Sequence, residues 1–341
     1  MKMKKYMGLA AALMAAVLAM TGCGGTGETA ENKYQIGIVQ QSEHGSLDAA
    51  TEGFMDKLTE LLGEENVTFD LKNAQGEQTN STTIATKFVS DGVDLIMANG
   101  TTALQSAAVA TGDIPIVGAS VSDYITAGVV DSNEAPGKNV TGVSDLAEIS
   151  AQVDVLLQFC QEDTKVAVVY CSAEPNSAYQ AKLAEEHLQA LGRDYAIYTA
   201  ADSNDIQAVM TKVVSDCGAV YIPTDNTFAS NMEIVKNITL PAGVPSFAGA
   251  EPMCRIGALA TLSISYYDLG VKAAEMAYEI LVNGANPAEM PIAFVSEGIT
   301  PKYNGDMAAA LNVEIPEGME ALETVGWSGN LSKAGRNAPL L

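Results

Sequence analysis

Short runs of β-branched and apolar residues alternate with longer amphipathic stretches from Tyr34 onward. The runs predict strands at residues 35–39, 67–71, 95–98, 116–118 and 140–143. Between them lie helical patterns, for example at 47–62, where Leu47, Ala50, Phe54, Leu58, Leu61 and Leu62 share one face. Strands that alternate with helices are typical of a parallel sheet with crossover helices, so the pattern predicts an α/β fold.

The same alternation starts again after Asp145. It predicts helices at 150–159, 177–191 and about 205–214, and strands at 166–170, 195–199, 219–222 and 246–248. The last part predicts a helix at 268–283 closed by Asn283-Gly284, a strand at 292–295 and a helix at 307–311. This part is too short for a third domain. We therefore expect two Rossmann-like lobes with parallel sheets, joined by a hinge that the chain crosses more than once.

The first 22 residues have the three parts of a secretory signal. Lys2, Lys4 and Lys5 precede an apolar run at 7–20, which is shorter than the roughly 20 residues of a membrane span. Thr21-Gly22-Cys23 follows and resembles the lipobox of bacterial lipoproteins, although Met20 replaces the usual leucine. We expect cleavage after residue 22, acylation of Cys23, a flexible tether at 23–33 and an extracytoplasmic location on the cell membrane. The alternative is an ordinary signal peptide that is cut elsewhere.

Charge and composition narrow the class of protein further. The formal net charge of −24 becomes −27 once the three signal lysines are removed, which disfavours nucleic acid as a partner. The content of 48% hydrophobic residues is typical of a globular protein. About 310 residues remain after the signal and the tether, which is more than a single hydrophobic core usually holds. Cys160, Cys171, Cys217 and Cys254 form no C-x-x-C pair, so we expect buried thiols, with one disulfide as the alternative in an exported protein.

Loops that follow the predicted strands are rich in small polar residues, at 40–46, 99–102, 119–123, 172–177 and 224–227. Ligands of open α/β sheets bind outside the carboxyl ends of strands. Thr101, Thr102, Ser120 and Ser177 suit an anionic group at a helix start, and Asp225 suits an ammonium group. Together they predict an amino-acid ligand. The alternative is that each residue only caps its helix.

Catalytic and metal-binding patterns are sparse in the sequence. It contains no G-x-S-x-G, H-E-x-x-H or Gly-Lys-Ser/Thr phosphate loop, and only two histidines, His44 and His187. We expect no catalytic residue, no metal and no cofactor. The rival hypothesis is a surface hydrolase that uses Glu43 and His44.

Several segments carry a resemblance that runs nearly from end to end. They are Glu43–Ala49, Asn73–Glu77, Ile114–Val117, Asn139–Asp145, Glu174–Ser177, Pro223–Thr227, Gly257–Ala260 and Tyr266–Gly270. In these segments the chain resembles the substrate-binding lipoproteins of ABC importers in the tryptophan/tyrosine-binding group. The resemblance implies a type I periplasmic-binding fold, in which two lobes joined by three crossings close over a ligand and dock on an ABC permease.

The resemblance also implies boundaries and a ligand shell. One lobe would comprise 34–145 plus about 265–295, the other 146–264 plus about 296–325, followed by a tail at 326–341. The implied shell is Ser46, Thr101, Ser120, Asn176, Ser177, Asp225 and Asn226. Gly45 and Thr102 stand where many relatives are expected to have proline, which bears on ligand identity.

An aromatic amino acid, tryptophan or tyrosine, is the ligand that the resemblance favours, bound by a monomer. Its ring would need an apolar slot. The candidates are Tyr124, Tyr266, Tyr267 and Phe228, at least two of which we expect in the core, whereas Trp327 lies in the tail. The alternatives are the same fold with a nucleoside, sugar or branched amino acid, and a chemosensory binding subunit.

Overall fold

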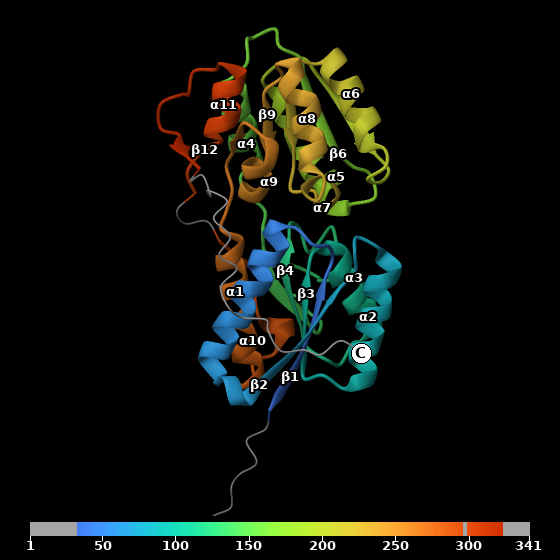
Figure 1. Ribbon diagram of the computed structural model, residues 1–341. Coiled ribbons are helices and arrows are strands. Elements are labelled where there is room, and N and C mark those ends of the chain that lie inside the picture. Colours follow the sequence, from blue (N-terminus) through green and yellow to red (C-terminus); the bar gives the residue numbers. More distant parts are fainter. Residues whose placement is uncertain (1–32, 296–298, 323–341) are drawn as a thin grey trace, which may run out of the picture. The chain divides into compact units, whose positions relative to one another are not determined.

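The computed structural model describes residues 33–295 and 299–322 (Figure 1). The predicted signal segment, Cys23, the tether up to residue 32 and the tail with Trp327 lie outside these ranges. From Tyr34 the described chain forms two sheets with helices on both faces of each. Each sheet with its helices is called a lobe below. No helix in the described ranges is both long enough and apolar enough to cross a membrane.

The first lobe is built on six parallel strands in the order β11-β5-β4-β3-β1-β2. Their bounds are β1 (Tyr34–Gln40), β2 (Val67–Asn73), β3 (Leu95–Asn99), β4 (Ile116–Val121), β5 (Val140–Ser144) and β11 (Ala293–Phe294). Strands β3, β4 and β5 are buried along their whole length, as expected for parallel strands that are covered on both faces.

Helices α1 (Gly45–Leu62) and α10 (Tyr266–Leu281) cover one face of this sheet, and α2 (Gln78–Asp91) and α3 (Thr101–Ala110) cover the other (Figure 1). Two glycines let α1 and α10 approach closely. A Cβ atom on Gly270 would lie 2.0 Å from the Ala50 carbonyl oxygen, and one on Gly53 would lie 2.2 Å from the Tyr267 carbonyl oxygen. Only glycine therefore fits at this contact.

The second lobe has seven strands in the order β13-β12-β10-β9-β8-β6-β7, parallel except where β12 meets β10. Their bounds are β6 (Val166–Cys171), β7 (Tyr195–Ala200), β8 (Ala219–Ile222), β9 (Ser246–Ala248), β10 (Ala260–Thr261), β12 (Lys302–Tyr303) and β13 (Glu320–Ala321).

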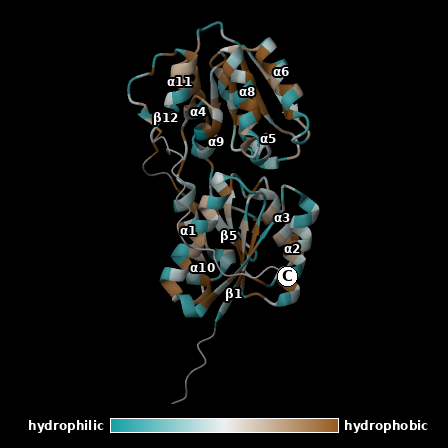
Figure 2. Cartoon of the chain, viewed as in Figure 1, coloured by the Kyte–Doolittle hydropathy of each residue, from teal (hydrophilic) through white to brown (hydrophobic). Residues whose placement is uncertain are grey.

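Helices also cover both faces of this second sheet. Helices α4 (Ile149–Leu157), α5 (Pro175–Ala190) and α11 (Gly305–Leu311) pack on one face, and α6 (Ile206–Asp216) and α8 (Met232–Ala242) on the other. Two short helices, α7 (Asn226–Ala229) and α9 (Glu251–Gly257), follow β8 and β9. Figure 2 shows hydrophobic residues along the strands and hydrophilic residues on the outer helix turns.

The chain passes between the lobes three times: from β5 to α4, from β10 to α10, and from β11 to β12, where residues 296–298 are outside the described ranges. The α/β fold with two mainly parallel sheets, expected from the sequence, is confirmed. The four cysteines in the described ranges carry free thiols.

Some predicted elements differ from the observed ones. Helix α10 begins two residues before the predicted start, because the Ser265 hydroxyl accepts a hydrogen bond from the Asp268 amide (3.2 Å) and caps the helix there. The pattern gave no specific range for α8 or α9, nor for the two-residue strands β10, β12 and β13. The two residues of each of these strands are too few for a periodicity to be read. Single 3₁₀ turns occupy Glu64–Asn66 and Pro287–Glu289.

Candidate functional site

A small pocket with a cavity volume of about 10 Å³ lies where strand-end loops of both lobes meet. This volume is about that of one water molecule and is far below the range for small-molecule sites, about 300–1,000 Å³. Its lining residues come from both lobes: His44, Ser46, Leu47, Ser120, Asp145, Asn176, Thr224, Asp225, Asn226, Ala229, Ala250, Met253 and Tyr266.

Five of the predicted ligand-binding residues line this pocket: Ser46, Ser120, Asn176, Asp225 and Asn226. The other three do not. Thr102 lines a larger open groove nearby, and its amide donates to the Gln41 side chain (3.0 Å). Thr101 and Ser177 are buried and line neither space; the Ser177 hydroxyl accepts from the Asn176 amide nitrogen (3.2 Å).

Asp225 is a buried carboxylate in the pocket wall. It caps α7, because its Oδ1 atom accepts a hydrogen bond from the backbone amide of Phe228 (2.8 Å), and its Oδ2 atom accepts one from the backbone amide of Cys171 at the end of β6 (2.7 Å). Burial, and then the negative charge of Glu174, raise the pKa of Asp225 to about 8. A cation placed beside this carboxylate would remove part of that penalty.

Glu174 lies close enough to Asp225 for its charge to act on it, lines the larger groove and is also buried. One carboxylate oxygen accepts hydrogen bonds from the backbone amide and the hydroxyl of Thr227 (both 2.7 Å). The other accepts hydrogen bonds from the backbone amide (3.0 Å) and the side-chain amide (2.7 Å) of Asn226. Among the described residues that line the pocket there is no lysine or arginine. The site therefore holds buried acidic side chains without a basic partner of their own.

His44 continues this network across to the first lobe. Its Nε2 atom lies 3.0 Å from the Asn226 Oδ1 atom. Because the Asn226 amide nitrogen already donates to Glu174, Oδ1 is the acceptor, and His44 Nε2 carries the proton. Burial lowers the pKa of His44, which favours the neutral ring. The Nδ1 atom is then a bare acceptor.

Four lining residues carry buried polar atoms without a partner: His44 Nδ1, Ser46 Oγ, Ser120 Oγ and Asn176 Oδ1. Buried polar groups in folded proteins almost always have a hydrogen-bond partner, so this concentration points to a polar ligand. Ser120 also has φ of 55°, in the left-handed region that non-glycine residues rarely adopt. Such strain is common where a side chain or amide is held for binding.

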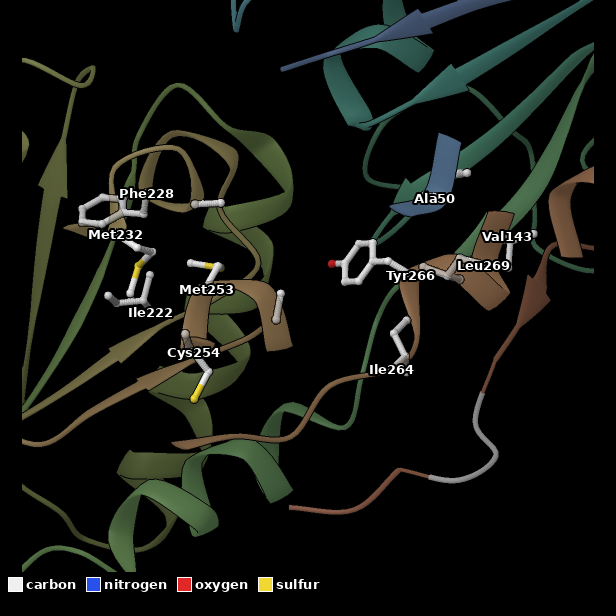
Figure 3. Packing of buried hydrophobic residues seen from close by; sticks show 14 of the residues in the cluster. Ala50, Val143, Ile222, Phe228, Met232, Met253, Cys254, Ile264, Tyr266 and Leu269 are labelled. Carbon is white, nitrogen blue, oxygen red and sulfur yellow. The ribbon is translucent and has the colours of Figure 1, made fainter. Parts of the chain in front are cut away.

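The remaining wall is apolar and consists of Leu47, Ala229, Ala250, Met253 and Tyr266. In Figure 3 the Tyr266 side chain extends from α10 toward the part of the second lobe that carries Met253. The Tyr266 hydroxyl donates to the Asp145 Oδ2 atom (2.9 Å).

Tyr266 is the one aromatic candidate that lines the pocket. Tyr124 and Phe228 belong to the core, whereas Tyr267 is 41% exposed and its hydroxyl donates to Asp56 (3.2 Å). The expectation that at least two of the four would be core residues is met.

Neither ring nitrogen of His44 contacts a hydroxyl or a thiol, and Glu43 contributes only its backbone carbonyl, to Ser230 (3.5 Å). The arrangement therefore lacks the nucleophile–base contact that the hydrolase hypothesis requires. In the part of the chain that the structure describes, no cluster of three His, Cys, Asp or Glu residues could hold a metal ion.

The sequence interpretation missed Asp145, Ala250 and Met253. All three follow strands, β5 and β9, so the same strand-end rule would have found them. They were missed because Asp145 was taken as the boundary between the two units, and because the loop after β9 is mostly apolar.

Comparisons with known proteins agree with this geometry. Residues 35–324 match the family described as ABC transporter substrate binding protein. A tyrosine-binding protein of Clostridioides difficile is 34% identical over 308 residues, which cover 87% of this chain and 89% of that protein.

Two solved structures add to the picture. An ABC domain in complex with L-Trp, from Streptococcus pneumonia, is 30% identical, covers 85% of this chain and 100% of its own, and has a TM-score of 0.81. A substrate-binding protein with adhesive properties from Clostridium difficile, in its ligand-free, open structure, is 36% identical, covers 85% and 99%, and has a TM-score of 0.65.

Proposed function

The chain belongs to the ABC transporter substrate-binding proteins, and from this premise we propose that it captures an aromatic amino acid, tyrosine or tryptophan, for an ABC importer. Proteins of this family are receptors rather than enzymes. The tyrosine-binding relative and the L-Trp complex support an aromatic ligand. The observation that carries the proposal is Asp225, a buried carboxylate in the pocket wall with no basic residue beside it among the described lining residues.

The ligand ammonium group would lie against Asp225 and the bare Asn176 Oδ1 acceptor. The ligand carboxylate would face the hydroxyls of Ser46 and Ser120, beside the first turn of α1. A helix N-terminus stabilises an anion by about 0.3–1 kcal/mol, and up to about 2 kcal/mol when partly buried.

The ring would lie beside Leu47, Met253 and Tyr266, and the lobes would have to move apart to admit it. Burying an aromatic side chain removes about 150–250 Å² from water, which is worth roughly 4–6 kcal/mol. The ring therefore supplies affinity, and the polar groups orient it.

Calorimetry tests the ligand class directly. We expect L-tyrosine or L-tryptophan to bind, and L-leucine, a hexose and a nucleoside to give no heat at the same concentrations. Mass spectrometry of small molecules that co-purify with the chain gives an independent answer. Absence of binding by any aromatic amino acid would overturn the proposal.

We also propose that the lobes close around the ligand and that the closed form docks on a permease. Support comes from the higher TM-score to the L-Trp complex than to the ligand-free, open structure, despite its lower identity. Small-angle scattering with and without ligand tests closure. Co-purification with the permease, rather than with a membrane sensor, tests the partner.

Attachment to the membrane through Cys23 is a separate proposal, which rests on the sequence of the first 23 residues. Stable anchoring takes more than one acyl chain. The intact mass of the chain extracted from membranes should show a lipid-modified Cys23 at its N-terminus. Cys23→Ser should release the chain from the membrane, and Met20→Leu tests whether the unusual residue slows processing.

A further inference from the structure

Ionisable side chains in the pocket wall are of one sign. Asp145 and Asp225 line the pocket, and Glu174, whose charge acts on Asp225, lines the neighbouring groove. The single histidine, His44, has its pKa lowered by burial and is neutral around pH 7. A free carboxylate entering this pocket therefore meets acidic side chains and finds no cation among the described lining residues.

Hydrogen-bonding capacity in the pocket is also one-sided. Asn176 Oδ1 is an acceptor without a donor, because the amide nitrogen of the same side chain already donates to the Thr224 carbonyl oxygen (2.9 Å). His44 Nδ1 is a second acceptor without a donor. Asn176 is 7% exposed, so no bulk water replaces the missing partner. A ligand that donates hydrogen bonds would satisfy both acceptor atoms.

Only the hydroxyls of Ser46 and Ser120 remain as side-chain donors without a partner in the pocket. An ammonium group has three donors and no acceptor, whereas a carboxylate has acceptors only. The wall thus satisfies a ligand amine with buried carboxylate and amide oxygens. It offers a ligand carboxylate the two neutral hydroxyls and the start of α1, on which Ser46 lies.

We infer that the pocket recognises the amine far more strongly than the carboxylate, so that it also binds aromatic ethylamines that have no carboxylate and rejects arylpropanoates that have no amine. This inference rests on the proposed function, because it places the same ring against the same apolar wall. It extends the ligand class from aromatic amino acids to aromatic monoamines.

The test is a calorimetric titration of the full-length chain, freed of bound ligand by unfolding and refolding, at pH 7.5. The probes are L-tyrosine, tyramine and 3-(4-hydroxyphenyl)propanoate, with L-tryptophan, tryptamine and 3-indolepropanoate as a second series. We expect tyramine or tryptamine to bind within about thirtyfold of the parent amino acid, since one helix N-terminus contributes at most about that factor. The propanoates should bind at least a hundredfold more weakly.

Ser46→Ala provides the matched variant, because alanine is a good helix residue in the first turn of α1 and removes only the hydroxyl. It should weaken L-tyrosine binding by about three- to tenfold and leave tyramine binding unchanged. A thermal melt monitored by circular dichroism checks that the variant is folded. Equal weakening of both ligands would contradict the assignment of Ser46 to the ligand carboxylate.

The results separate this inference from the function on which it rests. If the amino acid binds and its amine binds more than a hundredfold more weakly, the inference fails and the proposed function holds. If a propanoate binds as tightly as its amine, the inference also fails. If none of the six compounds binds, both fail.

Discussion

His44 and Asn226 lie 182 residues apart in the sequence, one at the start of α1 in the first lobe and the other at the start of α7 in the second, yet His44 Nε2 donates to Asn226 Oδ1 at 3.0 Å. The Asn226 amide nitrogen in turn donates to Glu174 (2.7 Å). A second contact joins the lobes, from the Gln180 amide nitrogen to the Ser122 hydroxyl (2.8 Å). These contacts join the two sides of the pocket wall.

Loss of the His44 contact should shift the lobes toward an open arrangement. A hydrogen bond contributes about 0.5–1.5 kcal/mol net, so His44→Leu should change the closed-to-open ratio about two- to twelvefold. Small-angle scattering without ligand measures the change as a larger radius of gyration. His187→Leu is the matched control, because the only other histidine contacts Asp154 (2.7 Å) within the second lobe. Equal radii for the two variants would refute the prediction.

Removal of the charge on Asp225 should abolish most ligand binding. Truncating one partner of a buried charge pair costs about 2–5 kcal/mol, so Asp225→Asn should raise the Kd for the amino acid by a factor of about thirty to several thousand. Asparagine is also a good N-cap, so α7 should persist. Asp202→Asn, at an exposed carboxylate of the neighbouring groove, should leave the Kd unchanged. If Asp225→Asn bound the amino acid with wild-type affinity, the ligand amine would not bind at Asp225.

Ligand affinity should depend on pH through Asp225. The pKa of this carboxyl is raised from its ordinary value to about 8, so below pH 8 it is mostly protonated before binding. An ammonium ligand favours the ionised form, so binding releases a proton, and affinity rises by up to about tenfold per pH unit from pH 6.5 to 8. Calorimetric titrations in buffers of different ionisation enthalpy measure the number of protons released on binding. A flat profile, or the same profile in Asp225→Asn, would disprove the assignment.

The same raised pKa has the opposite effect on folding. The unfolded carboxyl ionises near pH 4, whereas the folded one stays protonated until about pH 8. Asp225 therefore lowers the free energy of unfolding progressively between pH 4 and 8 in the absence of ligand. Denaturant titrations of wild-type and Asp225→Asn chains at pH 5 and 8 should show a smaller loss of stability in the variant. A larger loss of stability between pH 5 and 8 in Asp225→Asn than in the wild type would contradict this predicted effect of Asp225.

The α1–α10 contact should not tolerate a side chain at Gly270. A Cβ atom there would lie 2.0 Å from the Ala50 carbonyl oxygen, and overpacking of this kind costs about 1–3 kcal/mol or more. Gly270→Ala should therefore lower the free energy of unfolding by at least that amount in denaturant titrations. Gly305→Ala is the control, since nothing lies within 4 Å of its added Cβ atom. Wild-type stability in Gly270→Ala would mean that the helices can separate at no cost.

Strand and helix patterns predicted most of the fold because the long elements repeat with clear periods. The predicted strand at 95–98 is extended by only one residue in β3 (Leu95–Asn99). The pattern could not locate β12, whose two residues pair with β10 only because the chain returns from the first lobe. That pairing depends on contacts between segments far apart in the sequence, which no local window contains.

The candidate site shows a similar division. Strand ends pointed to Ser120, Asn176 and Asp225, which line the pocket. The same rule gave Thr101, which is buried beside the pocket without lining it, because position at a strand end does not fix how deep a side chain lies. Met253 was missed because an apolar wall residue looks the same in sequence as a core residue.

The contact of α1 with α10 also sets when the first lobe can be completed during synthesis. Tyr34 in the first strand donates its hydroxyl hydrogen bond to Leu281, 247 residues later (3.1 Å). At about 5–20 residues per second, a ribosome needs roughly ten to forty seconds to extend the chain from the end of α1 to the end of α10. For that interval α1 has no helix to cover its apolar face. The emerging chain thus remains without a finished N-terminal core until α10 has been made.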